Sequence, residues 1–219
     1  MYLFTHLALA QIAAVRLQPA YLDEFAWGTV FPDIYWSAGI PRDQTHLGKR
    51  ALECLQMEYP EQRSFIQGYR VHLLLDEIDL VRLVRSAFPL ALSQKILLRY
   101  FALYLHEDML RLLFEDHFLD RSGYQKKLPI SGKQNAILTK LGLHQDMILF
   151  YAARARTYFY NQPIKNRRVQ DLETELNDLY EIRNDICKYR KLMKNPLLSS
   201  ILTLAVKNAG LEKLAMGLI

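Results

Sequence analysis

The sequence predicts an all-α protein, built as a bundle of several helices. Three observations support this fold class: apolar residues recur at helical spacing, no segment alternates as a strand does, and Pro and Gly separate the helical segments. With 219 residues, 51% of them hydrophobic, the chain is long enough to enclose a core. We expect one domain overall, in which a helical core over 1–120 carries a helical C-terminal part, 121–219, packed on it.

The N-terminal half predicts four helical segments separated by turns. Pro19 ends the first segment, and Pro32 favours an extended Phe31, which would place Asp33 at a sharp turn. A loop over 37–44 precedes Thr45 and His46, and Pro60 suits the first turn of a long central helix. The expected helices cover 3–17, 21–29, 49–59 and 60–88.

The C-terminal half predicts further helices around one glycine- and proline-containing loop. That loop spans 120–133 and is the best internal boundary, and Gly142 is a plausible helix stop. The segment before Met193 is the most polar, which indicates a solvent-exposed face, and Pro196 begins a last apolar helix. The other expected helices cover 91–118, 133–141, 144–160 and 166–193.

Charge and cysteine usage narrow the class of protein without naming a function. A formal charge of +5 suits anionic substrates, nucleic acid or an acidic membrane surface. Cys54 and Cys187 lie far apart, so neither a disulfide framework nor a cysteine zinc site is indicated, and we expect a cytoplasmic location. Residues 1–15 lack the basic start of a signal peptide, and no segment has the roughly 20 uninterrupted apolar residues of a transmembrane helix.

The stretch from Gly68 to Glu77 carries the strongest chemical signal. His72 and Asp76 are four residues apart, so they share one face of a helix, and Asp79 falls on the same stripe. Burying such polar groups unpaired is costly, and a divalent metal would be a partner for both, because imidazole and carboxylate are ordinary zinc ligands. The simpler interpretation is a hydrogen-bonded pair. Gly68, one turn before His72, would allow another segment to approach the backbone closely.

Four pieces of sequence occur in a recognisable order: His6, Phe31-Pro32-Asp33-Ile34, Thr45-His46 and Gly68-x-x-x-His72-x-x-x-Asp76. Together they resemble the zinc-dependent phospholipase C family, whose all-helical fold is shared with single-strand-specific zinc nucleases. The resemblance covers about the first 80 residues. It implies that one zinc is held by Asp33, His46, His72 and Asp76, that a neighbouring zinc is bound through His6, and that Asp76 can bridge the two.

The resemblance implies a metal-dependent phosphoric ester hydrolase, a phospholipase C-like phosphodiesterase that uses metal-activated water. Asp33 is the candidate general base, and Asp79 would orient a ligand histidine. We expect one or two zinc ions, because no His-x-x-x-Glu cluster follows Asp76, and another divalent metal stays open. The substrate would be a phosphodiester, from a phospholipid head group or a nucleotide. Aromatic residues near Asp33 are either core or substrate contacts: Trp27, Phe31, Tyr35 and Trp36.

A different class of function stays open beside the enzyme. The chain would then be a non-catalytic, metal-stabilised helical module whose aromatic C-terminal half binds a partner. A third alternative is a helical domain in which the His and Asp side chains only form hydrogen bonds. Contact with a membrane surface and the oligomeric state are also left open by the sequence.

Overall fold

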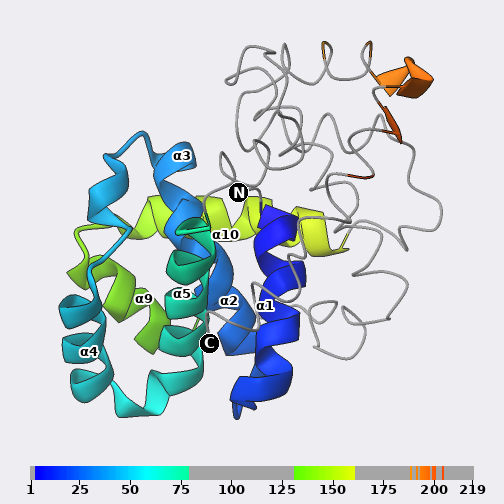
Figure 1. Cartoon of the computed structure of the whole chain (residues 1–219). Helices are drawn as coiled ribbons and strands as arrows, with labels where there is room; N and C mark the ends of the chain where they lie inside the picture. Colours follow the sequence, from blue (N-terminus) through cyan, green and yellow to red (C-terminus); the bar gives the residue numbers. More distant parts are fainter. Residues whose placement is uncertain are drawn as a thin grey trace.

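The computed structural model describes residues 3–78 and 131–160, together with short pieces between 188 and 204. Within these residues the chain is all helical, without a strand, which confirms the predicted fold class (Figure 1). The helix expected over 91–118, most of the helix over 166–193, most of the last helix and the proposed boundary at 120 lie outside the described residues. The α-helices are α1 (Leu3–Leu17), α2 (Leu22–Val30), α3 (Ile34–Ala38), α4 (Lys49–Glu58), α5 (Arg63–Asp76), α9 (Gly132–Lys140) and α10 (Gln145–Tyr160).

Helices α2 and α5 cross at two glycines, and this crossing is the centre of the described fold. A Cβ atom on Gly28 would overlap the carbonyl oxygen of Phe65, and one on Gly68 would overlap the carbonyl oxygen of Phe25. The close approach that was predicted at Gly68 is therefore confirmed, and the approaching segment is the backbone of α2. Because neither glycine has a side chain, the two helix backbones come into direct contact.

Helix α1 completes the N-terminal part by packing against α2 and α5 (Figure 1). Its buried face carries Ala10, Ala13 and Ala14, whose small side chains let a neighbouring helix come near. Phe31, which follows α2, is fully buried, and its ring lies 6.0 Å from that of Phe65 in α5. Phe31 and Trp27 are therefore core residues, whereas Trp36 keeps 53% of its surface exposed.

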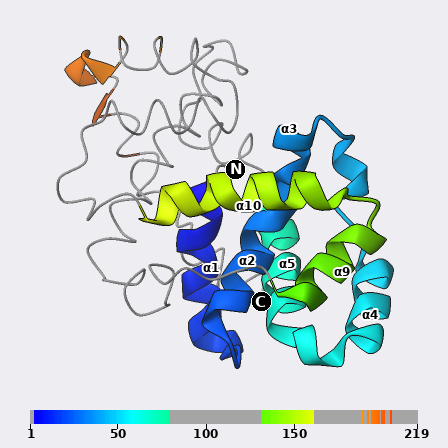
Figure 2. The same ribbon diagram turned by 180° about the vertical axis from the view of Figure 1, so that it is seen from behind.

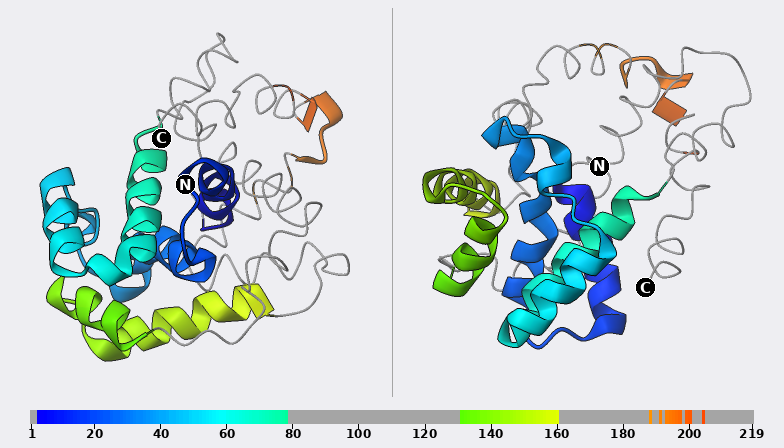
Figure 3. Two further views of the ribbon diagram at one scale, coloured as in Figure 1. Left: turned by 90° about the horizontal axis from the view of Figure 1, so that it is seen from below. Right: turned by 90° about the vertical axis from the view of Figure 1, so that its left-hand side faces the viewer.

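Helices α9 and α10 form a layer along one side of the N-terminal helices (Figures 2 and 3). Tyr151 of α10 donates a hydrogen bond of 2.8 Å to the carbonyl oxygen of Val30. At the other end of the layer, Lys140 pairs with Glu58 of α4. Ser131 caps α9 through a reciprocal pair of hydrogen bonds with Gln134. Residues 131–160 thus pack on the same core as the first 78.

Three predicted elements differ from the structure. The central helix, expected over 60–88, begins as a short 3-10 turn (Pro60–Gln62) and its α-helix ends at Asp76, followed by a turn at Glu77. The loop expected over 37–44 starts later, because α3 continues to Ala38 and a 3-10 turn forms at Arg42–Gln44.

None of the described helices is long and apolar enough to span a membrane.

The third difference concerns the chain before Asp33. Phe31 has helical backbone angles, φ −65° and ψ −32°, and begins a 3-10 turn (Phe31–Asp33) that leads directly into α3. The preference of a pre-proline residue for extended geometry is overridden here, because the helical turn buries the Phe31 ring among aromatic neighbours. Asp33 therefore lies at the junction of two helical segments.

Candidate metal centre

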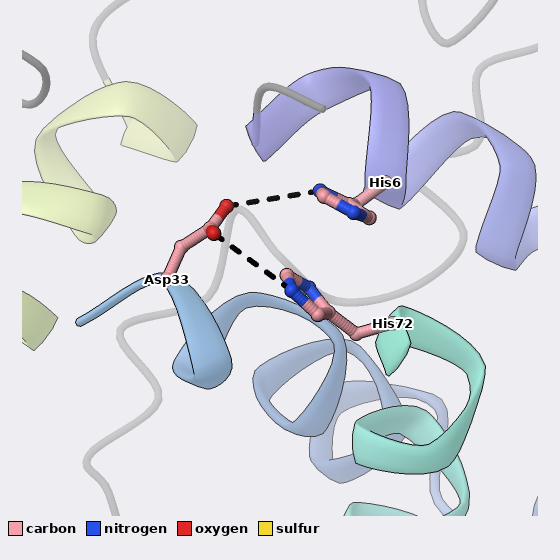
Figure 4. A group of neighbouring side chains, drawn as sticks. All are labelled: His6, Asp33 and His72. Atoms are coloured by element: carbon pink, nitrogen blue, oxygen red, sulfur yellow. Dashed lines mark ion pairs between the residues drawn. The ribbon is translucent and has the colours of Figure 1, made fainter. Parts of the chain in front are cut away.

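Five side chains meet where α1, the Phe31–Asp33 turn, the loop after Arg42–Gln44 and the end of α5 come together. All five were singled out from the sequence, and three of them are drawn in Figure 4. Two groups of three could each hold a metal ion, with ligand atoms that lie within 4.8 Å of one another. The first group is His6, Asp33 and His72, and the second is His46, His72 and Asp76.

His72 is the member shared by both groups. Its Nδ1 lies 2.7 Å from the carbonyl oxygen of Thr29, so Nδ1 must carry the proton and donate. In the neutral ring, Nε2 then carries a lone pair. This nitrogen is buried without a hydrogen-bond partner among the described residues, 3.7 Å from Asp33 Oδ1 and 3.5 Å from Asp76 Oδ2. A lone pair that faces two carboxylate oxygens is repelled by them unless a proton or a metal ion lies between the groups.

His6 comes to the same point from α1. Its ring is fully buried and stacks on that of His72, with centroids 3.9 Å apart and an angle of 18° between the planes. His6 Nε2 hydrogen-bonds Asp76 Oδ1 at 2.9 Å. His6 Nδ1 is buried without a hydrogen-bond partner among the residues the structure describes, 3.7 Å from Asp33 Oδ2. Figure 4 shows both histidine rings turned toward the two oxygens of Asp33.

His46 reaches the cluster from a loop that is anchored by Thr45. The Thr45 hydroxyl donates to the carbonyl oxygen of Pro32 at 2.8 Å. The backbone carbonyl oxygen of Thr45 accepts a hydrogen bond from the Tyr69 hydroxyl of α5. His46 Nδ1 lies 3.2 Å from the carbonyl oxygen of Arg42. These contacts direct His46 Nε2 to Asp76 Oδ2, 3.0 Å away. The loop is thus tied both to the Asp33 turn and to α5.

The contacts of Asp33 with the two histidines are longer than hydrogen bonds and slightly longer than the spacing between two ligands of one zinc ion. Two atoms each bonded to one tetrahedral zinc at 2.0–2.2 Å are about 3.3–3.6 Å apart. Direct charge-assisted hydrogen bonds are shorter, at about 2.7–2.9 Å. The contacts of Asp33 with His6 and His72, both 3.7 Å, leave room for an ion between the groups. The nitrogen and oxygen donors also match what zinc prefers.

Burial and neighbouring groups shift the pKa values of His6, Asp76 and Asp33 in different directions. Burial and the neighbouring His72 lower the pKa of His6 well below its usual value, so the ring is neutral at pH 7. Burial raises the pKa of Asp76, but hydrogen bonds from His46 and His6 outweigh it, so the pKa lies well below its usual range. Burial raises the pKa of Asp33, which suits a carboxylate that accepts a proton.

Arg42 was not predicted as part of this site, and Tyr35 was predicted only as either a core residue or a substrate contact. Arg42 Nη2 lies 2.5 Å from Asp76 Oδ2, and Tyr35 packs edge-on against His46, with ring centroids 5.3 Å apart. Burial and the charge of Asp33 raise the pKa of Tyr35 to about 12, so its hydroxyl stays protonated. Their positions in a loop and on a five-residue helix carried no periodic signal. Asp79, expected to orient a ligand, lies outside the described residues.

Comparison with known proteins adds no relative: no family model, curated protein or solved structure matches this chain. The five side chains and their geometry are therefore the basis on which a function can be proposed.

The buried His6 predicts that the metal-free protein loses stability as the pH falls below about 6.5. Above this pH, His6 is neutral in both states. Below it, the unfolded chain binds a proton that folded His6 does not accept, because burial lowers its pKa. We expect the free energy of unfolding to fall by up to about 1.4 kcal/mol per pH unit from this residue. Urea denaturation with a chelator present, at pH 7.5, 6.5 and 5.5, measures it.

The matched comparison is His6→Phe, which removes the titrating group and keeps a ring that can stack. Its unfolding free energy should decline less steeply over the same range. Equal slopes for the two proteins would contradict the assignment. The raised pKa of Asp33 has the opposite effect on stability, but Asp33 is present in both proteins, so the difference between their slopes reports on His6.

Proposed function

We propose that this chain is a metal-dependent phosphoric ester hydrolase, a phospholipase C-like phosphodiesterase whose site is the five-residue cluster. The observation that carries the proposal is the His72 Nε2 atom: buried, without a hydrogen-bond partner among the described residues, and facing two carboxylates across 3.5–3.7 Å. A proton there would draw these groups to shorter distances. Zinc is the ion that best fits three imidazoles and two carboxylates, and another divalent metal stays open.

A divalent ion held there supplies polarisation of a phosphoryl oxygen and acidification of a water molecule. His6, His46 and His72 would supply nitrogen ligands, and the Thr29 carbonyl orients the His72 ring for this role. Asp76 contacts His6 through one oxygen and His46 through the other, and it would supply a carboxylate ligand to the proposed site. One or two ions are compatible with these positions.

Asp33 is the proposed proton acceptor of the reaction. It is 3% exposed, and burial raises its pKa, which makes it a stronger proton acceptor than an exposed carboxylate. Both of its oxygens face a histidine nitrogen, at 3.7 Å each. The same carboxylate can therefore act as ligand through one oxygen and accept a proton through the other.

A phosphodiester also agrees with the charge around the cluster. The guanidinium of Arg42 lies at the solvent-exposed edge of the cluster, which we call its mouth. The chain as a whole has a formal charge of +5. Trp36, 53% exposed, stands near the Asp33 turn with its ring 5.1 Å from that of Tyr35. A phospholipid head group and a nucleotide both fit this description.

The second candidate is a non-catalytic module that a metal ion stabilises. The observation in its favour is that the five side chains come from four separate segments of the chain, so an ion would cross-link them. Both candidates require metal, and hydrolysis of bis-p-nitrophenyl phosphate separates them.

We expect the purified protein to contain one or two equivalents of zinc by elemental mass spectrometry. Asp76→Asn keeps the shape of the side chain but removes the charge that both His6 and His46 contact, so its zinc content should fall below about a tenth of wild type. Asp43→Asn, which removes an exposed carboxylate from the Arg42–Gln44 turn, is the matched control and should bind zinc as wild type does. Wild-type protein without bound metal, after growth and dialysis with zinc, would refute the proposal.

A further inference from the structure

Arg42 contacts an atom that a metal ion would also need. Its Nη2 lies 2.5 Å from Asp76 Oδ2, the oxygen that His46 Nε2 contacts at 3.0 Å and that faces His72 Nε2 at 3.5 Å. These three residues form one of the two groups that could hold a metal. The guanidinium and an ion bound to this group would therefore compete for one carboxylate oxygen.

Arg42 also differs from the rest of the cluster in its exposure. Its side chain is 52% exposed, whereas that of Asp76 is 11% exposed and those of His6 and His72 are fully buried. The guanidinium thus lies at the mouth of the site and can move toward solvent. The backbone of Arg42 is held separately, because its carbonyl oxygen accepts from the His46 N–H at 2.8 Å. The side chain can move without releasing the loop.

The charges of the cluster indicate when the Arg42 side chain would leave Asp76. Two carboxylates, Asp33 and Asp76, bring two negative charges, and Arg42 neutralises one of them when no ion is bound. One divalent ion balances both carboxylates, so the positive charge of Arg42 is then in excess at the mouth. An anion is attracted to such a site, and a guanidinium pairs with phosphoryl oxygens through two parallel hydrogen bonds.

We propose that Arg42 is the exchangeable cation of this site, which pairs with Asp76 in the metal-free protein and with a phosphoryl oxygen of the substrate once metal is bound. The inference rests on the proposed function and extends it to the residue that recognises the anionic group. It makes two predictions of opposite sign. Removing the guanidinium strengthens metal binding and weakens phosphate binding.

The experiment compares wild type, Arg42→Gln, Arg42→Lys and the control Arg50→Gln, which removes an exposed arginine on α4. Zinc affinity is measured alone, by competition with a chromophoric chelator. Arg42→Gln should bind zinc about two- to fivefold more tightly, the range expected for loss of one exposed competing ion pair. Arg50→Gln should stay within about twofold of wild type.

The second measurement uses saturating zinc, with inorganic phosphate as an inhibitor of bis-p-nitrophenyl phosphate hydrolysis. The inhibition constant and KM of Arg42→Gln should rise about tenfold, with kcat changed much less, because a charge-assisted hydrogen bond to the anion is lost. Arg42→Lys keeps the charge without the planar fork and should recover part of the effect. A purely structural role for Arg42 would not produce this split between KM and kcat.

The outcomes separate the two proposals. Absence of zinc from wild type, or of hydrolysis in zinc-loaded wild type, overturns the hydrolase and the role of Arg42 with it. If wild type binds zinc and hydrolyses the diester, but Arg42→Gln matches Arg50→Gln in both measurements, only the role of Arg42 is wrong. Weaker zinc binding by Arg42→Gln would also overturn it, because the guanidinium would then support the metal rather than compete with it.

Discussion

Replacing His72 should abolish both metal binding and hydrolysis. Its Nε2 is the one atom common to both groups of candidate ligands, so His72→Ala should lower zinc affinity by more than the 10- to 100-fold typical of outer partners of a metal site. Hydrolysis of bis-p-nitrophenyl phosphate should fall on the order of 1,000-fold or more. The change should exceed that of His46→Ala, because His46 belongs to only one of the two groups.

A second variant separates loss of metal from loss of fold. His72→Ala leaves the buried Thr29 carbonyl without its donor, at a cost of about 1–3 kcal/mol. In His72→Asn, the amide nitrogen stands where Nδ1 was, so the hydrogen bond to Thr29 can be kept while the Nε2 ligand is lost. We expect His72→Asn in the absence of zinc to be nearly as stable as metal-free wild type, and inactive.

The matched control is His144→Ala, which removes an exposed imidazole just before α10. It should keep both zinc and activity. Hydrolysis that persisted in a pure preparation of His72→Ala would show that the site has been assigned to the wrong residues.

Gly68→Ala should be among the most destabilising single substitutions in the described part of the chain. The added methyl group would overlap the carbonyl oxygen of Phe25, and both partners are helix backbone, which cannot move aside as a flexible side chain can. Overpacking usually costs about 1–3 kcal/mol, and we expect at least the upper value here. The melting temperature should fall by roughly 10 °C, because each kcal/mol corresponds to about 2–4 °C in a chain of this size.

Gly28→Ala tests the same crossing from the other helix and should be comparably destabilising. Gly132→Ala is the matched control: it lies at the start of α9, with no atom within 4 Å of the position of the added Cβ. That variant should be as stable as wild type or slightly more so, because alanine favours a helix over glycine. Equal melting temperatures for Gly68→Ala and Gly132→Ala would show that α2 and α5 do not cross at this distance.

The crossing also matters for the site. It sets α2 against α5, so the Thr29 carbonyl reaches His72 and the chain after α2 carries Asp33 to the same point. A folded Gly68→Ala protein should therefore bind zinc more weakly than wild type. The stability of the core and the geometry of the candidate site depend on the same contact.

Much of the local structure could be predicted from the sequence because its signals are short in range. The Pro19 break, the helix of 3–17 and the stop at Gly142 correspond to the structure within a residue or two. Gly68 was predicted to admit a close neighbour, which is correct, but its partner could not be named, since Gly28 lies forty residues earlier. Two predictions were wrong: the sequence favoured a helix that continues beyond Asp76 and an extended backbone at Phe31. Apolar spacing and the preference of a pre-proline residue are weaker than the tertiary packing at these positions.

The candidate site also has one part that the sequence predicts and another that depends on the tertiary structure. By itself, the sequence determined which residue types are present and that His72 and Asp76 share one helix face, since that follows from helical periodicity. Only the tertiary structure decided that His6, Asp33 and His46 meet them, and that Arg42 stands at the mouth on Asp76. It also decided which nitrogen of His72 is exposed to the carboxylates, through the Thr29 carbonyl. The physical reason is that periodicity acts within one helix, whereas these contacts join residues up to 70 positions apart and exist only when the helices have packed.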